Sequence, residues 1–339
     1  MVDAKKVRWG ILSTASIGMT KVIPAIQKSA RSEVLAIASR SAHSARKAAA
    51  ALGIPRAHGS YAALLADPDI DAIYNPLPNH LHVELTLAAN AAGKHVLCEK
   101  PISIDAKDAR QLRRARTDRL IMEGFMVRFH PQWLRAREIA RSGELGEVRA
   151  VRAVFSYHNT DPTNVRNKAD TGGGALLDIG CYPVVAARFF FEAEPKRVVS
   201  LIDRDPTFGT DRQVSVIADF GDGRHLDFMV STQMVPHQSI EILGTMGRVE
   251  IVIPFNAPQG EATALLVDAG HGFDGSLSRR EILSPCDQYT EMADAFARAV
   301  LGETMLPYGV EDAIHSMHVL DAILKSERSG GWATVEVSP

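Results

Sequence analysis

Strand-like and helix-like segments alternate through the first 123 residues, and this alternation limits the possible fold more than any other feature of the chain. The apolar, strand-like runs cover residues 7–12, 34–38, 72–74, 95–98 and 120–123. The helix-like segments lie between them, at residues 17–27, 44–52, 61–65, 80–91 and 105–116. Because parallel neighbouring strands need a crossover connection, this alternation predicts a parallel sheet with helices on both faces.

The pattern changes near residue 145, where strands of alternating character follow one another. Residues 214–220 and 226–230 alternate apolar and polar side chains on either side of Gly221-Asp222-Gly223, which predicts a hairpin. A second hairpin is expected between residues 240–243 and 249–253. This region therefore predicts a largely antiparallel sheet with one solvated or partner-covered face.

Two amphipathic helices are expected near the C-terminus, around residues 289–300 and 310–324, each with one apolar stripe. The predicted fold class is α/β, with a doubly wound Rossmann sheet in residues 1–124. Residues 125–339 are expected to form an α/β domain with a large open sheet, which serves substrate binding and oligomerisation. Its C-terminal helices could pack back on the first domain.

Composition narrows the possible partners. The chain has 339 residues, 46% of them hydrophobic, and its 38 basic and 40 acidic residues leave a net charge of −2. No basic stripe or long apolar run stands out, so neither nucleic acid nor a membrane is expected as a partner. Cys98, Cys181 and Cys286 lie far apart, which supports neither a disulfide framework nor a zinc site. With a polar N-terminus and no signal peptide, a reducing cytoplasm fits best.

A turn of small residues follows the first predicted strand. Dinucleotide-binding folds usually have G-x-G-x-x-G at this point, and here the pattern is S-x-A-x-x-G, ending at Gly18. A helix N-terminus beside a small-residue turn can bind a pyrophosphate through its amides and dipole, and Ser16 could cap that helix. The alternative is an ordinary turn between a strand and a helix. We expect the cofactor to contact Ser13, Thr14, Ala15, Ser16 and Ile17.

The end of the second predicted strand indicates which dinucleotide binds. NAD enzymes usually place a carboxylate here to bind the ribose diol, but this chain has Ser39, Arg40 and Ser41. Arg40 can pair with a 2′-phosphate, and the serine hydroxyls can donate to the same phosphate. Unless Arg40 is merely a surface residue that opens a loop, the cofactor is NADP(H), with NAD(H) possible.

A proline-rich loop, residues 75–82, follows the next strand of the predicted sheet. Ligands bind at the carboxyl ends of strands in open α/β folds, so this loop is expected to face the cofactor. Asn79 is a plausible N-cap for the following helix. His80 and His82 lie two residues apart and would face different ways on a helix, so no metal is expected. We expect the cofactor to contact Pro76, Leu77, Asn79 and His82.

Two short motifs supply groups for proton transfer. Glu99-Lys100-Pro101 ends a strand-like run, and Asp178 and Tyr182 are four apart in an apolar helical segment, on one face. Tyr182 is the expected acid/base, because an ammonium such as that of Lys100 lowers the pKa of a phenol. Lys100 could instead be the acid/base itself, and Asp178 could orient either residue or bind a sugar hydroxyl. Pro183 is expected to kink the helix after Tyr182.

Each of these residues also has an ordinary explanation, as a solvated lysine, a half-buried phenol and a local cap. Their order along the chain, beside a cofactor pattern, favours catalysis. Glu99, Lys100 and Arg128 are expected near the cofactor. Phe125 and the loop residues Arg166 and Asn167 are expected near the substrate, together with Asp178 and Tyr182. The loop, residues 160–174, looks mobile and could cover a hydroxylated substrate, or it could be an ordinary surface loop.

Taken together, these motifs resemble the Gfo/Idh/MocA oxidoreductases, from about Val7 to about Glu327. The resemblance rests on Asn-Pro with His-Leu-His, Glu-Lys-Pro, Phe-x-x-Arg-x-His-Pro, Gly-Gly-Gly followed by Asp-x-Gly-x-Tyr, and Gly-Thr-x-Gly. It implies a Rossmann domain, an α/β domain whose open sheet often forms subunit contacts, and a nicotinamide cofactor between them. Tyr182 is typical of the branch with dihydrodiol dehydrogenase, D-xylose 1-dehydrogenase, glucose-fructose oxidoreductase and sugar ketoreductases. Ser13 and Ala15 depart from the usual glycines.

The expected function is therefore an NADP-dependent oxidoreductase that acts on a sugar or polyol-like small molecule. One alternative is a trans-dihydrodiol or other cyclic-alcohol dehydrogenase that uses the same residues. A different alternative is a dinucleotide-binding sensor without turnover, although such a sensor has no need of Lys100 and Tyr182. The open sheet predicts a homodimer or homotetramer.

Overall fold

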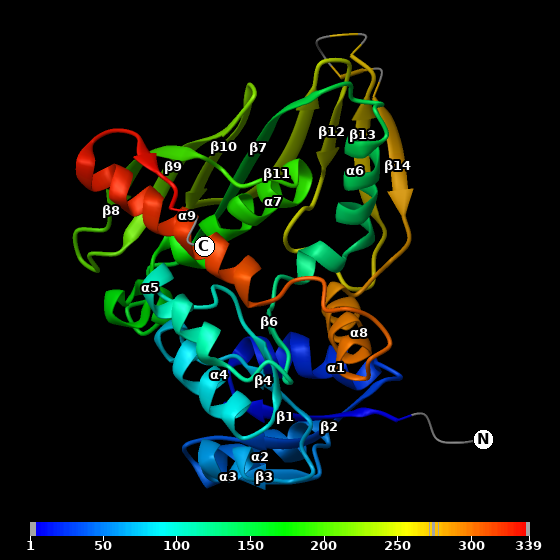
Figure 1. Cartoon of the computed structure of the whole chain (residues 1–339), viewed down its shortest axis with the longest axis vertical. Coiled ribbons are helices and arrows are strands. Elements are labelled where there is room, and N and C mark those ends of the chain that lie inside the picture. Colours follow the sequence, from blue (N-terminus) through cyan, green and yellow to red (C-terminus); the bar gives the residue numbers. More distant parts are fainter. Residues whose placement is uncertain (1–4, 271, 273–274, 277, 337–339) are drawn as a thin grey trace. The chain divides into compact units, whose positions relative to one another are not determined.

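The computed structural model describes residues 5–270, 272, 275–276 and 278–336; the first four residues, which belong to the polar N-terminus discussed above, lie outside these. The chain forms two compact units (Figure 1). The first unit comprises Met1–Met126 and Gln288–Ile314. The second comprises Val127–Asp287 and His315–Pro339. Each is described separately below.

The first unit is built on a parallel sheet with strand order β3-β2-β1-β4-β5-β6. This order, reversed between β1 and β4, is that of a dinucleotide-binding fold, in which ligands bind beyond the carboxyl ends of the strands. The sequence did not predict the short edge strand β3, whose residues are mostly exposed. The strands are β1 (Val7–Leu12), β2 (Ser32–Ala38), β3 (Arg56–His58), β4 (Ala72–Asn75), β5 (His95–Cys98) and β6 (Ile121–Glu123).

The helices of the first unit follow the predicted alternation. One C-terminal helix, α8, also belongs to this unit, where Phe296 packs on Trp9 of β1 with ring centroids 5.5 Å apart. The helix predicted at residues 105–116 is shorter and ends in a 3-10 turn. The helical elements are η1 (Gly18–Val22), α1 (Ile23–Lys28), α2 (Ala42–Leu52), α3 (Tyr61–Leu65), η2 (Asn79–Leu81), α4 (His82–Ala91), α5 (Ala106–Ala109), η3 (Arg110–Arg114) and α8 (Gln288–Val300).

The second unit contains a sheet with strand order β14-β13-β12-β11-β7-β10-β9-β8-β15. Among the pairings recorded for these strands, only β7 with β10 is parallel. Both predicted hairpins are confirmed: β9 pairs with β10 and β11 with β12. The strands are β7 (Val148–His158), β8 (Arg197–Arg204), β9 (Asp211–Gly221), β10 (Arg224–Ser231), β11 (Gln233–Gly244), β12 (Arg248–Ile251), β13 (Thr263–Asp268), β14 (Arg279–Leu283) and β15 (Ala333–Thr334).

Helices cover one face of this sheet, with α7 against β7 and β10 and α6 against β12 and β13. The predicted fold class is thus confirmed: a parallel Rossmann sheet and a mostly antiparallel sheet with helices. Both units contribute to η4 and α9, each of which crosses the division between them. The helical elements of this region are η4 (Met126–Phe129), α6 (Pro131–Arg141), η5 (Val165–Asn167), η6 (Ala169–Thr171), η7 (Leu176–Gly180), α7 (Cys181–Phe191) and α9 (Val310–Ser329).

The helical run of residues 169–191 is long and apolar enough to cross a membrane by length and composition alone. In this structure 94% of its most apolar window is buried inside the protein. A buried helix of this kind is the core helix of its own unit. Its aromatic end supports that assignment, because Phe190 stacks on Trp133 with ring centroids 5.5 Å apart.

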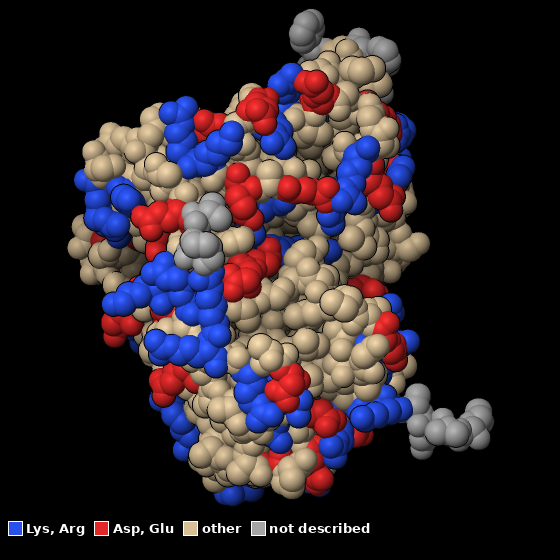
Figure 2. All heavy atoms as spheres, viewed as in Figure 1, with Lys and Arg blue, Asp and Glu red and all other residues tan. Residues whose placement is uncertain are grey.

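Charges of both signs are interleaved over much of the face seen in Figure 2. Many of them are ion-paired at the surface, as Arg8 is with Asp71 and Arg204 with Glu327. Exposed pairs of this kind contribute little to stability.

Candidate active site

The turn after β1 adopts a conformation that usually requires glycine. Ser13 has a φ of 74°, in the left-handed region, and its amide donates to the Ala38 carbonyl at 2.9 Å. The Ser13 hydroxyl accepts from the Ala15 amide at 3.2 Å. Ser16 does not cap the helix as expected, because it already lies within it and its carbonyl accepts from the Thr20 hydroxyl. The turn therefore keeps the geometry of a dinucleotide-binding loop while lacking its first two glycines.

The end of β2 presents the residues expected to select NADP. Arg40 is exposed and lies beside Tyr61, whose pKa is raised by burial, although the Arg40 guanidinium opposes this rise. The Ser41 hydroxyl accepts from the Ser44 amide at 3.2 Å and so caps α2. Its hydroxyl hydrogen can still donate. Residues 39–41 include no carboxylate, so this strand end fits a 2′-phosphate.

The loop after β4 is held by buried polar side chains. Asn75 donates to the His82 carbonyl and to the Thr86 hydroxyl, each at 3.2 Å, and its own oxygen accepts from the Leu77 amide at 3.3 Å. Asn79 is not an N-cap, because it is the first residue of a 3-10 turn and Pro78 precedes it as the capping position. The loop therefore reaches the sheet edge in a defined conformation.

His82 is expected to contact the cofactor, and the structure shows both of its ring nitrogens against main-chain carbonyls. Its side chain is 1% exposed, and its two ring nitrogens lie 2.7 Å from the Pro101 carbonyl oxygen and 2.6 Å from the Leu77 carbonyl oxygen. Burial lowers the pKa of His82, although its contacts with these two carbonyls raise it. The sequence shows a histidine near a loop but does not show that both of its nitrogens lie against main-chain carbonyls.

Lys100 follows β5 at the same edge of the sheet. Tyr74 donates to Glu99 Oε1 at 2.7 Å, and the Ile102 amide donates to Glu123 Oε1 at 2.7 Å. The Lys100–Pro101 peptide is cis, and Lys100 itself is half-buried. Burial, and then the Glu99 carboxylate, raise the pKa of Tyr74, so this phenol stays protonated as a donor. The Glu99 carboxylate is thus hydrogen-bonded to Tyr74, a residue of β4.

Strand register brings these loops together. Leu12 pairs with Ala38, Ile11 with Tyr74, and Asn75 with Cys98, so the four strands end at one edge. The predicted cofactor residues therefore lie at the same edge of the sheet. They belong to the turn after β1, the end of β2, the loop after β4 and the segment around Lys100.

Two predicted residues that follow β6 are buried instead of open to a ligand. The Phe125 side chain is 1% exposed and leaves almost no surface for a substrate, contrary to expectation. Arg128, in η4, is 3% exposed. The sequence places both residues after a strand end, but it does not show how far the chain covers them.

In the second unit, Asp178 is the centre of a polar cluster. Its Oδ2 accepts from the Tyr157 hydroxyl at 2.5 Å, and its Oδ1 accepts from Arg166 Nε at 2.9 Å. Burial and the Asp178 carboxylate raise the pKa of Tyr157, while Asp178 raises that of Arg166. The phenol and the guanidinium therefore stay protonated, and both donate to the carboxylate.

Tyr182 lies one helical turn beyond Asp178. Its side chain is 6% exposed, and its ring contacts those of Phe155 and Phe255, with centroids 5.8 and 5.3 Å away. The charge of Arg166 acts on Tyr182 as well as on Asp178 and Tyr157. Arg166 keeps 45% of its side chain exposed. The aromatic rings fix the phenol in place, and the polar cluster adds a cation to its surroundings.

Pro183 is expected to kink the helix after Tyr182, whereas the irregular turn of this helical run, the π turn η7, ends at Gly180, before Tyr182. The π turn η7 directly precedes α7, in which Pro183 is the third residue. Proline cannot donate an amide hydrogen, and a wider turn accommodates the missing bond. The same arrangement occurs in the first unit, where the π turn η1 precedes Pro24 of α1.

The loop before this helix is held by groups that the sequence did not indicate. Asn167 is buried and donates to the Asp161 carbonyl at 2.8 Å, so it organises the loop, and its expected contact with a substrate stays a prediction. Asp211 Oδ2 accepts from the Leu176 amide at 2.6 Å. Burial raises the pKa of Asp211 to about 6. Tyr157 could be anticipated from its strand, but Asp211 lies 35 residues from its partner and carries no local signal.

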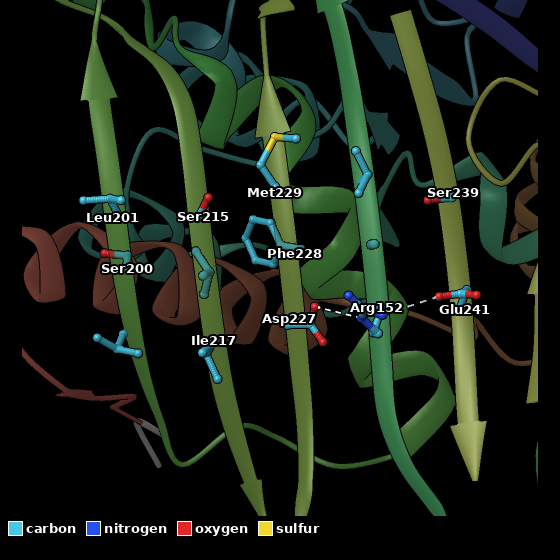
Figure 3. A pocket seen from close by; sticks show the side chains of 14 residues that line it. Arg152, Ser200, Leu201, Ser215, Ile217, Asp227, Phe228, Met229, Ser239 and Glu241 are labelled. Carbon is cyan, nitrogen blue, oxygen red and sulfur yellow. Dashed lines mark hydrogen bonds and ion pairs between the residues drawn. The ribbon is translucent and has the colours of Figure 1, made fainter. Parts of the chain in front are cut away.

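A hollow of about 610 Å³ lies on the helix-free face of the second sheet (Figure 3). Arg152 lies between Asp227 and Glu241 there, at 3.1 and 3.9 Å. Leu201 and Ile217, on neighbouring strands, are 76% and 47% exposed. The lining includes none of the predicted catalytic residues, so this hollow is separate from the chemistry proposed below.

Comparisons with known proteins agree with this architecture. Residues 7–122 match the family model described as "Oxidoreductase family, NAD-binding Rossmann fold", and residues 133–250 match the "GFO/IDH/MocA C-terminal domain". The chain is 44% identical to an uncharacterized oxidoreductase of Rhizobium meliloti, with 97% of this chain and 99% of the relative covered. It is 39% identical to D-xylose 1-dehydrogenase (NADP(+)) 2 of Haloferax volcanii, with the same coverage.

A solved structure is also similar. The 3-ketoreductase KijD10 from Actinomadura kijaniata, in complex with NADP and TDP-benzene, superposes with a TM-score of 0.87. The two chains are 29% identical, and the match covers 95% of this chain and 98% of the other. The similarity extends over both units.

Proposed function

Because this chain belongs to the Gfo/Idh/MocA family of NAD(P)-dependent oxidoreductases, we propose that it transfers a hydride between NADP and a carbonyl or hydroxyl carbon of a sugar-like substrate. Tyr182 is the acid/base of this proposal, and Lys100 assists it. The observation that supports the proposal is the cluster around Asp178, which accepts from Tyr157 and Arg166, while the charge of Arg166 also acts on Tyr182.

The substrate class is supported by the relatives. One is a D-xylose 1-dehydrogenase that uses NADP, and another is a 3-ketoreductase solved with NADP. A polyhydroxylated substrate also suits a site with several charged hydrogen-bonding groups. The exposed part of the Arg166 side chain supplies donors for substrate oxygens.

The first unit fits the cofactor. The amides of the turn and the start of the following helix suit a pyrophosphate, and Arg40 suits a 2′-phosphate. When bound, the nicotinamide supplies or accepts the hydride. The protein residues orient the reacting groups and move the proton.

In the direction of reduction, Tyr182 donates its phenolic proton to the oxygen of the forming alkoxide. The cations of Lys100 and Arg166 stabilise the phenolate that this step leaves behind. Asp178 does not need to bind substrate, because it holds Arg166 at 2.9 Å and Tyr157 at 2.5 Å. In the opposite direction, the phenolate accepts the hydroxyl proton of the substrate.

The open face of the second sheet is proposed to pack against a second copy of this chain. Exposed apolar side chains such as Leu201 lie on the same face as the paired charges of Arg152, which suits burial against a matching surface. Light scattering of a Leu201→Glu variant tests this, with a loss of the oligomer expected. We also propose a reducing, cytoplasmic setting, since the buried Cys98 and Cys181 are present as thiols.

The test of the catalytic proposal uses NADPH with a panel of aldoses, ketoses and dihydrodiols, followed by absorbance of the reduced cofactor. Tyr182→Phe and Lys100→Met are expected to lower kcat by about 10²- to 10⁴-fold while NADPH binding is retained. Lys47→Met, an exposed lysine of α2, is the matched control and is expected to leave kcat unchanged. Full turnover by Tyr182→Phe contradicts the proposal.

A further inference from the structure

His82 joins two segments that are separate in sequence. It is the first residue of α4 and is buried, and its ring lies between the carbonyl of Leu77 and the carbonyl of Pro101. Leu77 belongs to the loop after β4, and Pro101 directly follows Lys100 after β5. One imidazole therefore contacts both segments that border the proposed cofactor site.

We propose that His82 is a positioning residue, which holds the Leu77 loop for cofactor binding and the Lys100–Pro101 segment for catalysis. The catalytic half of this inference rests on the proposed role of Lys100. The distances, 2.6 Å to Leu77 and 2.7 Å to Pro101, are those of hydrogen bonds. Leaving a buried carbonyl without a hydrogen-bond donor costs free energy. Each contact with His82 therefore restrains its segment.

The chemistry of the ring makes the two contacts separable. Burial lowers the pKa of His82, whereas its contacts with the carbonyls of Pro101 and Leu77 raise it. Both partners are carbonyl oxygens, which only accept, so the ring holds both segments through hydrogen bonds when each of its nitrogens carries a hydrogen. Two amide side chains each replace one of these two donors. The amide nitrogen of asparagine takes the place of Nδ1, and that of glutamine takes the place of Nε2.

His82→Asn therefore keeps the Pro101 contact and gives up the Leu77 contact, whereas His82→Gln does the reverse. For His82→Asn we expect the Kd of NADPH to rise about tenfold, with kcat within about twofold. For His82→Gln we expect kcat to fall about tenfold, with the Kd within about twofold. His43→Gln, an exposed histidine of α2, is the control and leaves both quantities unchanged.

Hydrogen exchange separates this inference from the proposed function. The Ile102 amide, next to Pro101, is buried against Glu123, so its exchange reports on this segment without any turnover. Faster exchange at Ile102 in His82→Gln but not in His82→Asn supports the inference even if Lys100→Met remains active. Equal losses in the two variants, or a lower Tm with unchanged Kd, kcat and exchange, overturn it.

Discussion

Lys100 and Tyr182 are held in different ways. Around Lys100 the contacts are made largely by the main chain, through the Pro101 carbonyl and the Ile102 amide. Around Tyr182 they are made by side chains, through aromatic rings and through the cluster centred on Asp178. The position of a segment that is held by main-chain contacts is determined by the fold of the sheet. A residue held by side chains depends on distant positions, and it is the more sensitive of the two to single substitutions.

Of the predictions that follow, the largest effect is expected from replacing Asp178, the centre of the side-chain cluster. Asp178→Ala leaves the Tyr157 hydroxyl and the Arg166 guanidinium without their shared acceptor. We expect kcat to fall by about 10²- to 10³-fold, because the cation beside Tyr182 loses its anchor. Steady-state kinetics measure this, and Asp170→Ala, an exposed carboxylate of the same loop, is the control. A kcat within about twofold of the wild type would show that the cluster does not position Tyr182.

The same contrast explains what could be predicted from the sequence. Alternating segments and strand ends give the Rossmann sheet and place Lys100 at its edge, because these features are local. The pairing of Tyr157 with Asp178 and of Asp211 with Leu176 joins distant positions, and a single sequence does not show such pairs. His82 and Asn167 were assigned to ligands for the same reason, since their internal hydrogen bonds appear only in the folded chain.

A second prediction concerns Asp211, which holds the start of the helix that carries Tyr182. The pKa of this buried carboxyl is about 6 in the folded protein, against 3.8 as its ordinary value. The folded state therefore binds the proton more tightly, and stability is lost as pH rises from about 4 through 6. Two pKa units correspond to about 3 kcal/mol of unfolding free energy.

Asp211→Asn removes this titration and keeps an oxygen for the Leu176 amide. We expect the variant to be more stable than the wild type by up to about 3 kcal/mol at pH 8, and equally stable near pH 4. Urea denaturation at a series of pH values measures the difference. A difference that does not vary with pH would argue against an ionised, buried Asp211.

A third prediction addresses the first unit. Arg40→Asp replaces the proposed partner of the 2′-phosphate with the carboxylate typical of NAD enzymes. We expect the ratio of kcat/KM for NADP over NAD to fall by roughly 30-fold, equivalent to about 2 kcal/mol for a lost charge-assisted contact. Arg46→Asp, an exposed position of α2, makes the same charge change and is the control. An unchanged ratio would refute the role of Arg40.

The smallest effect is expected on stability, from the backbone conformation of Ser13. Ser13 has a φ of 74°, so glycine should fit this turn better than alanine, which has the same strain as serine but no hydroxyl. We expect Ser13→Gly to be more stable than Ser13→Ala by about 1 kcal/mol in urea denaturation. At Ser16, which is exposed and helical, the order should reverse, because glycine is the poorer helix former. If alanine were the more stable residue at position 13 as well as at position 16, the positive φ of Ser13 would not strain the turn. The serine at this position would then cost the turn no stability compared with glycine.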